Sequence, residues 1–118
     1  MAKLSLTELS GIDGFIVGAL IDSTSGLALA TQGTGLDLDL AAAGNTEVLR
    51  AKRKVAKSLG LNDDPEDILI TLERQYHLLR PLERNPDLFL YVVLDRSKAN
   101  LAMARHELKR FEKELDFS

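Results

Sequence analysis

The residues able to perform acid–base, nucleophilic or metal chemistry are scattered along this chain. The histidines are His77 and His106, and neither has a second histidine or a cysteine at ligand spacing, since the chain contains no cysteine. We expect His77 on a strand, at a surface or an interface, and His106 on the solvated side of a helix. Serine, threonine and aspartate are plentiful, but no nucleophile elbow and no Ser-x-x-Lys motif occurs. The sequence therefore predicts no catalytic residue and no enzyme.

Two further patterns resemble ligand-binding loops but lack their essential positions. Gly33-Thr34-Gly35 precedes a helical segment, as a phosphate-binding turn would, but position 38 is Leu and no Gly-Lys-Ser/Thr follows. An acidic cluster surrounds Pro65, yet a calcium loop also needs alternating oxygen donors, a central glycine and a terminal glutamate. The members of the cluster are Asp63, Asp64, Glu66 and Asp67. We interpret both patterns as loop and turn chemistry, and expect no cofactor and no metal.

The remaining candidate is a basic face on a predicted helix. Its members are three or four residues apart or adjacent, which places them on one side of a helix: Arg50, Arg53, Lys54 and Lys57. One interpretation is a solvated face near the helix C-terminus, where cations are favourable. The other is a surface for an acidic partner. Nucleic acid fits less well, because the net charge of the chain is −3 and no aromatic residues interleave the cluster.

Length and composition limit the classes of protein to which this chain can belong. A chain of 118 residues with 45% hydrophobic residues is expected to fold as a single domain spanning 1–118. The first residues carry no signal-peptide pattern, and no segment approaches the roughly 20 apolar residues of a membrane span. We therefore expect a cytoplasmic protein without membrane insertion.

The first half of the chain predicts a helix, a hairpin and a long helix. Ser5 and Glu8 have capping-box spacing, which predicts a short helix over 5–11. The segment 15–21 is apolar at both parities, typical of a strand covered on both faces, and 27–31 returns as its hairpin partner. A long helix over 37–59 follows, with Gly60 as its C-cap.

The second half predicts three strands and a final helix. The strands are 68–72, 76–82 and 88–94, separated by turn residues. Ser97 is expected to open the last helix, whose apolar seam comprises Leu101, Ala104, Leu108, Phe111 and Leu115. The element order α-β-β-α-β-β-β-α predicts an α+β fold on an antiparallel sheet.

These elements carry a resemblance to a known family. The runs 37–54, 67–71, 75–81 and 88–96, together with Ile12-Asp13-Gly14-Phe15 before the small-residue strand and Asp22-Ser23-Thr24-Ser25-Gly26 after it, resemble bacterial roadblock-type (dynein light chain) domains. The resemblance covers nearly the whole chain. It implies a roadblock/profilin-like, five-stranded antiparallel sheet in the order 2-1-5-4-3. Two helices would cover one face and the long helix the other.

The resemblance also implies a homodimer. The third strand would lie at an edge of the sheet and be unusually apolar, and such edges invite pairing with another chain. In roadblock-type domains third strands pair and central helices pack together about a twofold axis. The interface residues implied here are Ile68, Leu69, Ile70, Thr71, Leu72, Ala41 and Val48. The small residues 41–44 allow a close approach, either between paired helices or between helix and sheet.

The function implied is that of a non-catalytic scaffold or regulator. Roadblock-type domains bind Ras-like small GTPases or GTPase-regulating complexes, so the basic face is expected to contact such a partner. The dimer would influence nucleotide turnover by positioning groups of the GTPase itself. An alternative is a small-ligand-sensing domain of profilin-like architecture, although the apolar elements contain no cluster of convergent polar groups.

Overall fold

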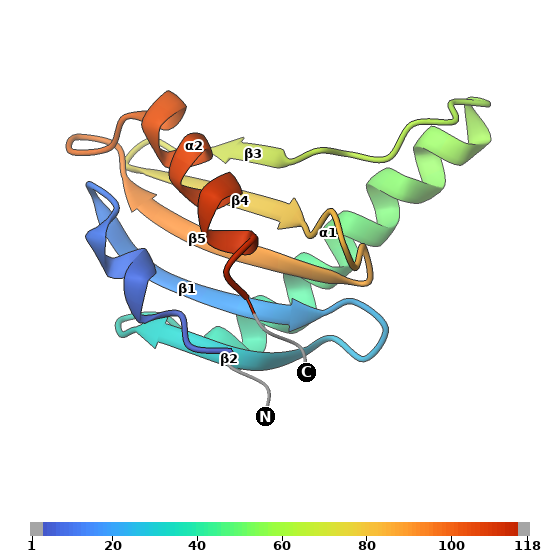
Figure 1. Ribbon diagram of the computed structural model, residues 1–118. Coiled ribbons are helices and arrows are strands. Elements are labelled where there is room, and N and C mark those ends of the chain that lie inside the picture. Colours follow the sequence, from blue (N-terminus) through green and yellow to red (C-terminus); the bar gives the residue numbers. More distant parts are fainter. Residues whose placement is uncertain (1–3, 116–118) are drawn as a thin grey trace.

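Helical and extended segments follow one another in the predicted order. The computed structural model describes residues 4–115. The elements are the 3-10 helix η1 (Thr7–Gly11), the strands β1 (Phe15–Asp22) and β2 (Leu27–Gly33), the helix α1 (Leu38–Ser58), the strands β3 (Ile68–Thr71), β4 (Gln75–Pro81) and β5 (Leu88–Asp95), and the helix α2 (Leu101–Glu112). Figure 1 shows the two long helices on opposite sides of the sheet.

The strands form one five-stranded sheet in the predicted order. It runs β2-β1-β5-β4-β3, and every neighbouring pair is antiparallel. The two strands that are apolar at both parities, β1 and β5, therefore lie next to each other in the middle. Every residue of β5 except Asp95 is buried, whereas β2, at one edge, alternates between exposed and half-buried residues. The parity of the apolar residues thus correctly indicated which strands are covered on both faces.

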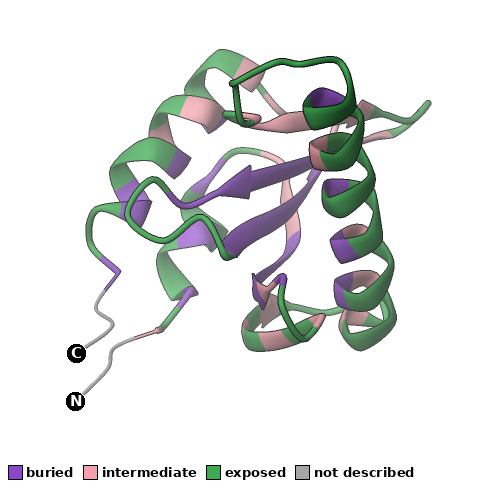
Figure 2. Cartoon of the chain, turned by 90° about the vertical axis from the view of Figure 1, so that its right-hand side faces the viewer, coloured by how far each residue is buried: buried purple, intermediate pink, exposed green. Residues whose placement is uncertain are grey.

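Helices cover both faces of the sheet and create two core layers. The layer beneath η1 and α2 includes Leu20, Leu90, Val92, Leu108 and Phe111. The layer beneath α1 includes Val17, Phe89, Val93, Ala42 and Leu49. Figure 2 shows the buried positions of the helices on the sides that face the strands.

The long helix begins and ends as its sequence predicts. Asp37 is the N-cap, and its Oδ1 accepts a hydrogen bond of 3.1 Å from the Leu40 N–H. At the C-terminus Gly60 has a φ of +74°, and its N–H donates to Lys57 O over 3.0 Å. The Leu61 N–H donates to Ala56 O over 3.0 Å, which completes a Schellman cap. The last turns of α1 extend past the sheet, as Figure 1 shows.

The predicted capping box of the first helix is wrong. The segment forms the short 3-10 helix η1, whose N-cap is Leu6 and has no side-chain capping bond. Ser5 Oγ instead accepts a 3.3 Å hydrogen bond from the Thr7 N–H, two residues on. The five-residue 3-10 helix starts at Thr7, so the N-cap position falls on Leu6, one residue beyond Ser5.

The predicted start of the last helix is also wrong, by three residues. Ser97 is held outside the helix, because both its N–H and its Oγ donate to Asp95 Oδ1, over 2.9 and 2.8 Å. These bonds lower the pKa of the Asp95 carboxyl. Asn100 is the actual N-cap, and its Oδ1 accepts from the Met103 N–H over 3.1 Å. Ser97 forms an Asx-type turn with Asp95 after β5 rather than capping α2.

Candidate partner-binding surfaces

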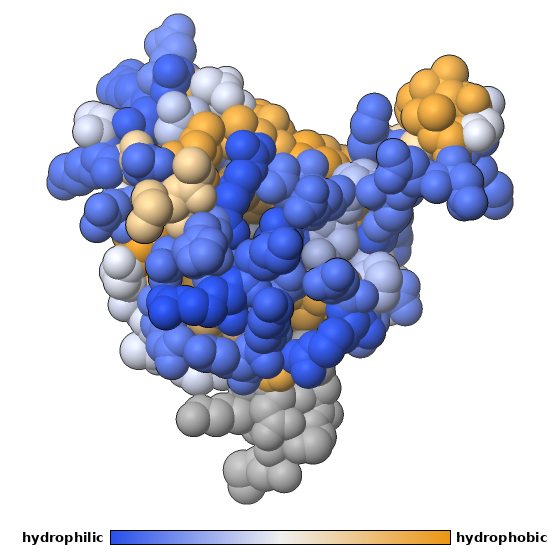
Figure 3. All heavy atoms as spheres, turned by 45° about the horizontal axis from the view of Figure 1, so that its top comes forward, coloured by the Kyte–Doolittle hydropathy of each residue, from blue (hydrophilic) through white to orange (hydrophobic). Residues whose placement is uncertain are grey.

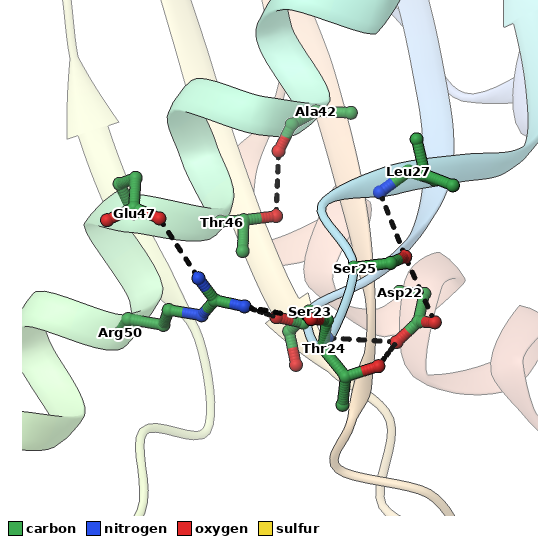
Figure 4. A network of polar contacts seen from close by, with 9 residues as sticks. All are labelled: Asp22, Ser23, Thr24, Ser25, Leu27, Ala42, Thr46, Glu47 and Arg50. Atoms are coloured by element: carbon green, nitrogen blue, oxygen red, sulfur yellow. Dashed lines mark hydrogen bonds and ion pairs between the residues drawn. The ribbon is translucent and has the colours of Figure 1, made fainter.

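The first arginine of the basic face is committed to a contact within the chain. One Arg50 nitrogen, Nη2, donates to the carbonyls of Ser23 and Thr24 over 2.6 and 3.1 Å, and Nη1 forms an ion pair of 3.1 Å with Glu47. Figure 4 shows the guanidinium between α1 and the β1–β2 turn. Arg50 therefore fastens this turn to the helix, a role that periodicity alone does not reveal.

The β1–β2 turn is itself ordered by short side-chain contacts. The Asp22 carboxylate accepts from the Thr24 N–H over 2.9 Å, from Thr24 Oγ1 over 2.7 Å and from Ser25 Oγ over 3.2 Å. The hydrogen bonds from Thr24 contribute most to lowering the pKa of Asp22. These bonds favour the ionised carboxylate and hold the β1–β2 turn in shape.

The second arginine of the basic face also has partners within the chain. Arg53 forms a bidentate pair with Asp64, with both N–O distances at 2.9 Å, and its Nη2 also donates to Pro86 O over 3.0 Å. Lys54 and Lys57 are exposed, and no ion pair is present for either among residues 4–115. Of the four predicted contact residues, Arg50, Lys54 and Lys57 are exposed, whereas Arg53 is half-buried. The two lysines present free charge, whereas the two arginines mainly hold loops in place.

A second feature of α1 is an exposed apolar stripe. We use this term for Leu40, Gly44, Val48, Ala51, Val55 and Leu59, which follow one another at intervals of three or four. Leu40, Val55 and Leu59 are 70%, 49% and 67% exposed. The stripe ends at the projecting tip of the helix, where Leu61 is also exposed, and Figure 3 shows apolar side chains at this tip. The side of α1 that packs on the sheet is a different one, so this helix has two apolar sides.

The predicted dimer residues fall into four settings. Val48 belongs to the exposed apolar stripe, whereas Ala41 is half-buried and packs against the core layer beneath α1. The edge strand β3 carries Ile68, Leu69, Ile70 and Thr71, and it pairs with β4 on one side. Ile68 and Ile70 pack against the layer beneath α1, and Leu69 packs against the opposite layer. Leu72 lies just beyond β3, in a turn where its N–H donates to Gln75 O over 2.9 Å.

His77 lies on β4, half-buried on the α1 side of the sheet. Its Nε2 donates to Gln75 Oε1 over 2.9 Å, and Nδ1 lies 3.0 Å from the Tyr91 hydroxyl, whose proton it accepts in the neutral ring. The two rings meet edge to face, with centroids 5.6 Å apart. Burial lowers the pKa of His77 and raises the pKa of Tyr91. This contact joins the side chains of the neighbouring strands β4 and β5.

The other candidate ligand residues are placed in separate settings. His106 is exposed on α2, as expected. The Gly33-Thr34-Gly35 segment ends β2 and leads into the cap of α1. Within residues 4–115 no group of three or more His, Cys, Asp or Glu side chains is arranged to hold a metal ion. None of the helices in the same range is long and apolar enough to cross a lipid bilayer.

Sequence reasoning missed a charged network beneath α2. Arg80 Nη2, from β4, lies 3.3 Å from Glu112 Oε1, from α2, and both side chains are more than nine-tenths buried. Asp67 lies 3.9 Å from Arg80 and receives a bidentate contact from Arg105, which raises the pKa of that guanidinium. The acidic cluster around Pro65 thus supplies partners to arginines, besides forming a turn. The sequence signal was Arg80 itself, a charge inside an otherwise apolar strand.

Comparisons with known proteins give matches in structure but not in sequence. No protein-family model matches the chain, and no curated protein sequence matches it. Among solved structures, Myxococcus xanthus MglB is similar, with a TM-score of 0.79 and 18% identity over 91% of this chain and 85% of that one. A Roadblock/LC7 domain from Streptomyces avermitilis has a TM-score of 0.79 and 17% identity, over 91% of this chain and 88% of that one.

A third structure extends the same result. The gliding protein MglB from Thermus thermophilus has a TM-score of 0.77 and 23% identity, over 91% of this chain and 79% of that one. Together with the strand order, these similarities establish that the chain has the fold of roadblock/LC7 domains. The fold expected from the sequence resemblance is therefore confirmed. At these identities the similarity defines the fold alone, and function has to be argued from the surfaces.

Proposed function

We propose that this chain is a homodimeric, non-catalytic scaffold of the cytoplasm that binds a small GTPase and regulates it. The observation that supports the dimer is the exposed apolar stripe of α1. This helix covers one face of the sheet, and the half-buried Ile68 and Ile70 of the edge strand β3 pack into the core layer on that same face. Water-exposed apolar surface of this kind marks an interaction site. Pairing of β3 with its twofold copy would continue the sheet and bring the two stripes together.

The GTPase assignment combines the fold with the charge on α1. Roadblock-type domains, whose fold this chain has, bind Ras-like GTPases. Lys54 and Lys57 extend from α1 without an ion pair in residues 4–115, and Arg50 and Arg53 lie beside them. In a twofold dimer both copies of this face would lie on one side, which doubles the positive surface offered to an acidic partner. Regulation would then act by positioning catalytic groups of the GTPase.

The dimer is tested by analytical ultracentrifugation of the wild type and of Val48→Glu. A carboxylate in the middle of the stripe would be buried against its own copy, so the variant should sediment as a folded monomer. Lys113→Glu, which introduces the same side chain at an exposed position just after α2, is the control and should remain dimeric. A wild type that is monomeric at micromolar concentrations would refute the dimer.

The GTPase is tested by capture from lysate of the source organism on immobilised wild-type protein, with GDP or a non-hydrolysable GTP analogue added. We expect one small GTPase to be retained with one of the two nucleotides. Its affinity for the double variant Lys54→Glu, Lys57→Glu should fall at least tenfold, while Lys113→Glu should bind as the wild type does. Unchanged affinity of the double variant would remove the basic face from the contact. Retention of no GTPase with either nucleotide would contradict the assignment itself.

A further inference from the structure

Part of the sheet face beneath α1 is left open towards the β3 edge. The helix packs mainly on β1 and β2, and its last turns extend past the sheet (Figure 1). Ile68 and Ile70 of β3 and Gln75 and His77 of β4 belong to this face, and all four are half-buried. His77 is the ionisable side chain among these four.

In the proposed dimer, the second copy covers this open face. Pairing of β3 with its own copy places the two open faces side by side, and the apolar stripes of the two α1 helices meet over them. We propose that His77 is a pH-sensitive switch of the dimer, in which the subunits associate with the imidazole neutral and separate when it is protonated. The inference rests on the proposed dimer and is independent of the GTPase.

The hydrogen bonds of His77 suit the neutral ring. Nδ1 lies 3.0 Å from the Tyr91 hydroxyl and accepts its proton, and Nε2 donates to Gln75 Oε1 over 2.9 Å. Protonation adds a proton at Nδ1, the accepting atom, so the hydroxyl has to turn away. Because the ring is half-buried in the single subunit, water still reaches it and hydrates the cation. A second copy packed over the ring would remove that water.

The elements around His77 supply no negative charge to replace the water. Within residues 4–115 no carboxylate forms an ion pair with His77, and its register partners on β3 and β5 are the apolar Ile70 and Val93. The nearby flank of α1 carries Asn45 and, two helical turns further on, Lys52. The charge closest along this flank is therefore positive.

The ends of β3 do not supply a compensating charge either. Asp67 precedes the strand, but its carboxylate accepts from Arg105 of α2 over 2.9 and 3.2 Å, on the opposite face of the sheet. Glu73 and Arg74 follow the strand and carry one charge of each sign. Their charges offset each other, so they do not favour an imidazolium on β4.

The surface that the second copy brings is also unfavourable for a cation. The exposed apolar stripe contains no charged residue. Beside it on α1 lie Glu47, which is already paired with Arg50 over 3.1 Å, and the cations Lys52 and Lys54, which form no ion pair in residues 4–115. A protonated His77 would thus be buried against apolar side chains and positive charge.

Association is therefore coupled to proton release. Burial already lowers the pKa of His77 in the single subunit, and a second copy would lower it further. The dimer contains two such rings, so below the pKa of the free subunit the Kd should rise by up to about a hundredfold per pH unit. Above that pKa both states hold neutral rings, and the Kd should not change with pH.

The test is analytical ultracentrifugation of the full chain at about pH 8 and about pH 5.5, at constant ionic strength. The Kd of the wild type should be at least fivefold higher at the lower pH. Net charge has the opposite effect, because the charge of −3 at pH 7 shrinks as the pH falls and repulsion between copies weakens. Circular dichroism of the same samples checks that the separated subunits remain folded.

Three variants assign the response to this ring. His77→Gln cannot be protonated, so its Kd should agree at the two pH values within about twofold. His106→Gln removes an exposed imidazole from α2 and should respond as the wild type does. Tyr91→Phe removes the hydrogen bond that favours neutral His77, so the rise in Kd should begin about half a pH unit higher. A residue with a merely structural role would not move this pH profile.

The outcomes separate the switch from the dimer. Equal Kd values of the wild type at the two pH values, or a wild-type response in His77→Gln, would overturn the switch and leave the dimer standing. Dissociation that occurs only together with unfolding would also overturn the switch. A wild type that is monomeric at pH 8 would overturn the dimer and the switch together.

Discussion

The Arg80 guanidinium of β4 and the Glu112 carboxylate of α2 form an ion pair of 3.3 Å that is almost completely shielded from water. The residues are 32 positions apart in the chain. Their contact joins the last helix to the strand next to the sheet edge. Removing two charges from water has a large cost, which offsets much of the attraction between them, so the pair as a whole contributes little net stability.

This pair leads to a prediction about single and double substitutions. Glu112→Leu or Arg80→Met alone leaves a buried charge without its partner, and each should lower the free energy of unfolding by about 3 kcal/mol. The double variant removes both charges, and it should lie within about 1 kcal/mol of the wild type. Urea denaturation at one fixed protein concentration measures all three values. Additive losses in the double variant would show that the two side chains act independently.

The two halves of the basic face should respond differently to truncation. Arg50→Ala removes the hydrogen bonds to the carbonyls of the β1–β2 turn, and should lower the free energy of unfolding by about 1 kcal/mol. Lys54→Ala removes an exposed side chain and should change it by less than about 0.5 kcal/mol. Urea denaturation of both variants distinguishes a structural from a free cation. Equal effects would mean that the Arg50 contact with the turn does not contribute to stability.

His77 should make stability depend on pH. Burial lowers its pKa in the folded state, so the unfolded chain binds more protons as the pH falls. The stability that depends on neutral His77 is then fully present above about pH 6.5, the pKa of an unfolded histidine, and declines as the pH falls toward the lower folded-state value.

Urea denaturation between pH 5 and pH 8 would reveal this slope, and His77→Gln should reduce it. His106→Gln, which removes an exposed imidazole, is the matched control. A wild-type slope that persists in His77→Gln would assign the effect to other groups.

Gly44 separates the stability of one subunit from the stability of the proposed dimer. It lies inside α1, and an added Cβ would meet no atom within 4 Å in the single chain. Gly44→Ala should therefore increase the free energy of unfolding of the monomer by about 0.5–1 kcal/mol through helix propensity. In the proposed dimer the same methyl group separates two closely packed helices, so association should weaken.

Sedimentation measures association, and urea denaturation at low protein concentration measures the stability of the single subunit. Gly11→Ala, which also has open space around its Cβ, is the control for association. Tighter association of Gly44→Ala would place this glycine outside the dimer contact.

The sequence by itself determined the order of the elements and which strands are covered on both faces, while the layer order was implied by the family resemblance. Apolar residues at both parities marked β1 and β5 as the strands covered on both faces, and Asp37 and Gly60 marked both ends of α1. These signals are local, because capping, turn formation and side-chain parity depend on residues close together in the chain. Ser97 shows the limit of such signals. Its side chain could cap a helix, but its N–H and Oγ donate to Asp95, two residues earlier, instead.

The tertiary structure alone decided what the charged and apolar surfaces do. From the sequence alone, residues 50–57 fitted a solvated face and a contact surface equally well. In the folded chain Arg50 binds the β1–β2 turn and Arg53 binds the segment 64–66, so both arginines have partners within the chain. Likewise, α1 is apolar on two sides, and periodicity does not say which side packs on the sheet. Long-range packing makes that choice, and it leaves the stripe from Leu40 to Leu59 exposed. Partners of buried charges such as Arg80 are chosen in the same way, by surfaces that meet only in the folded chain.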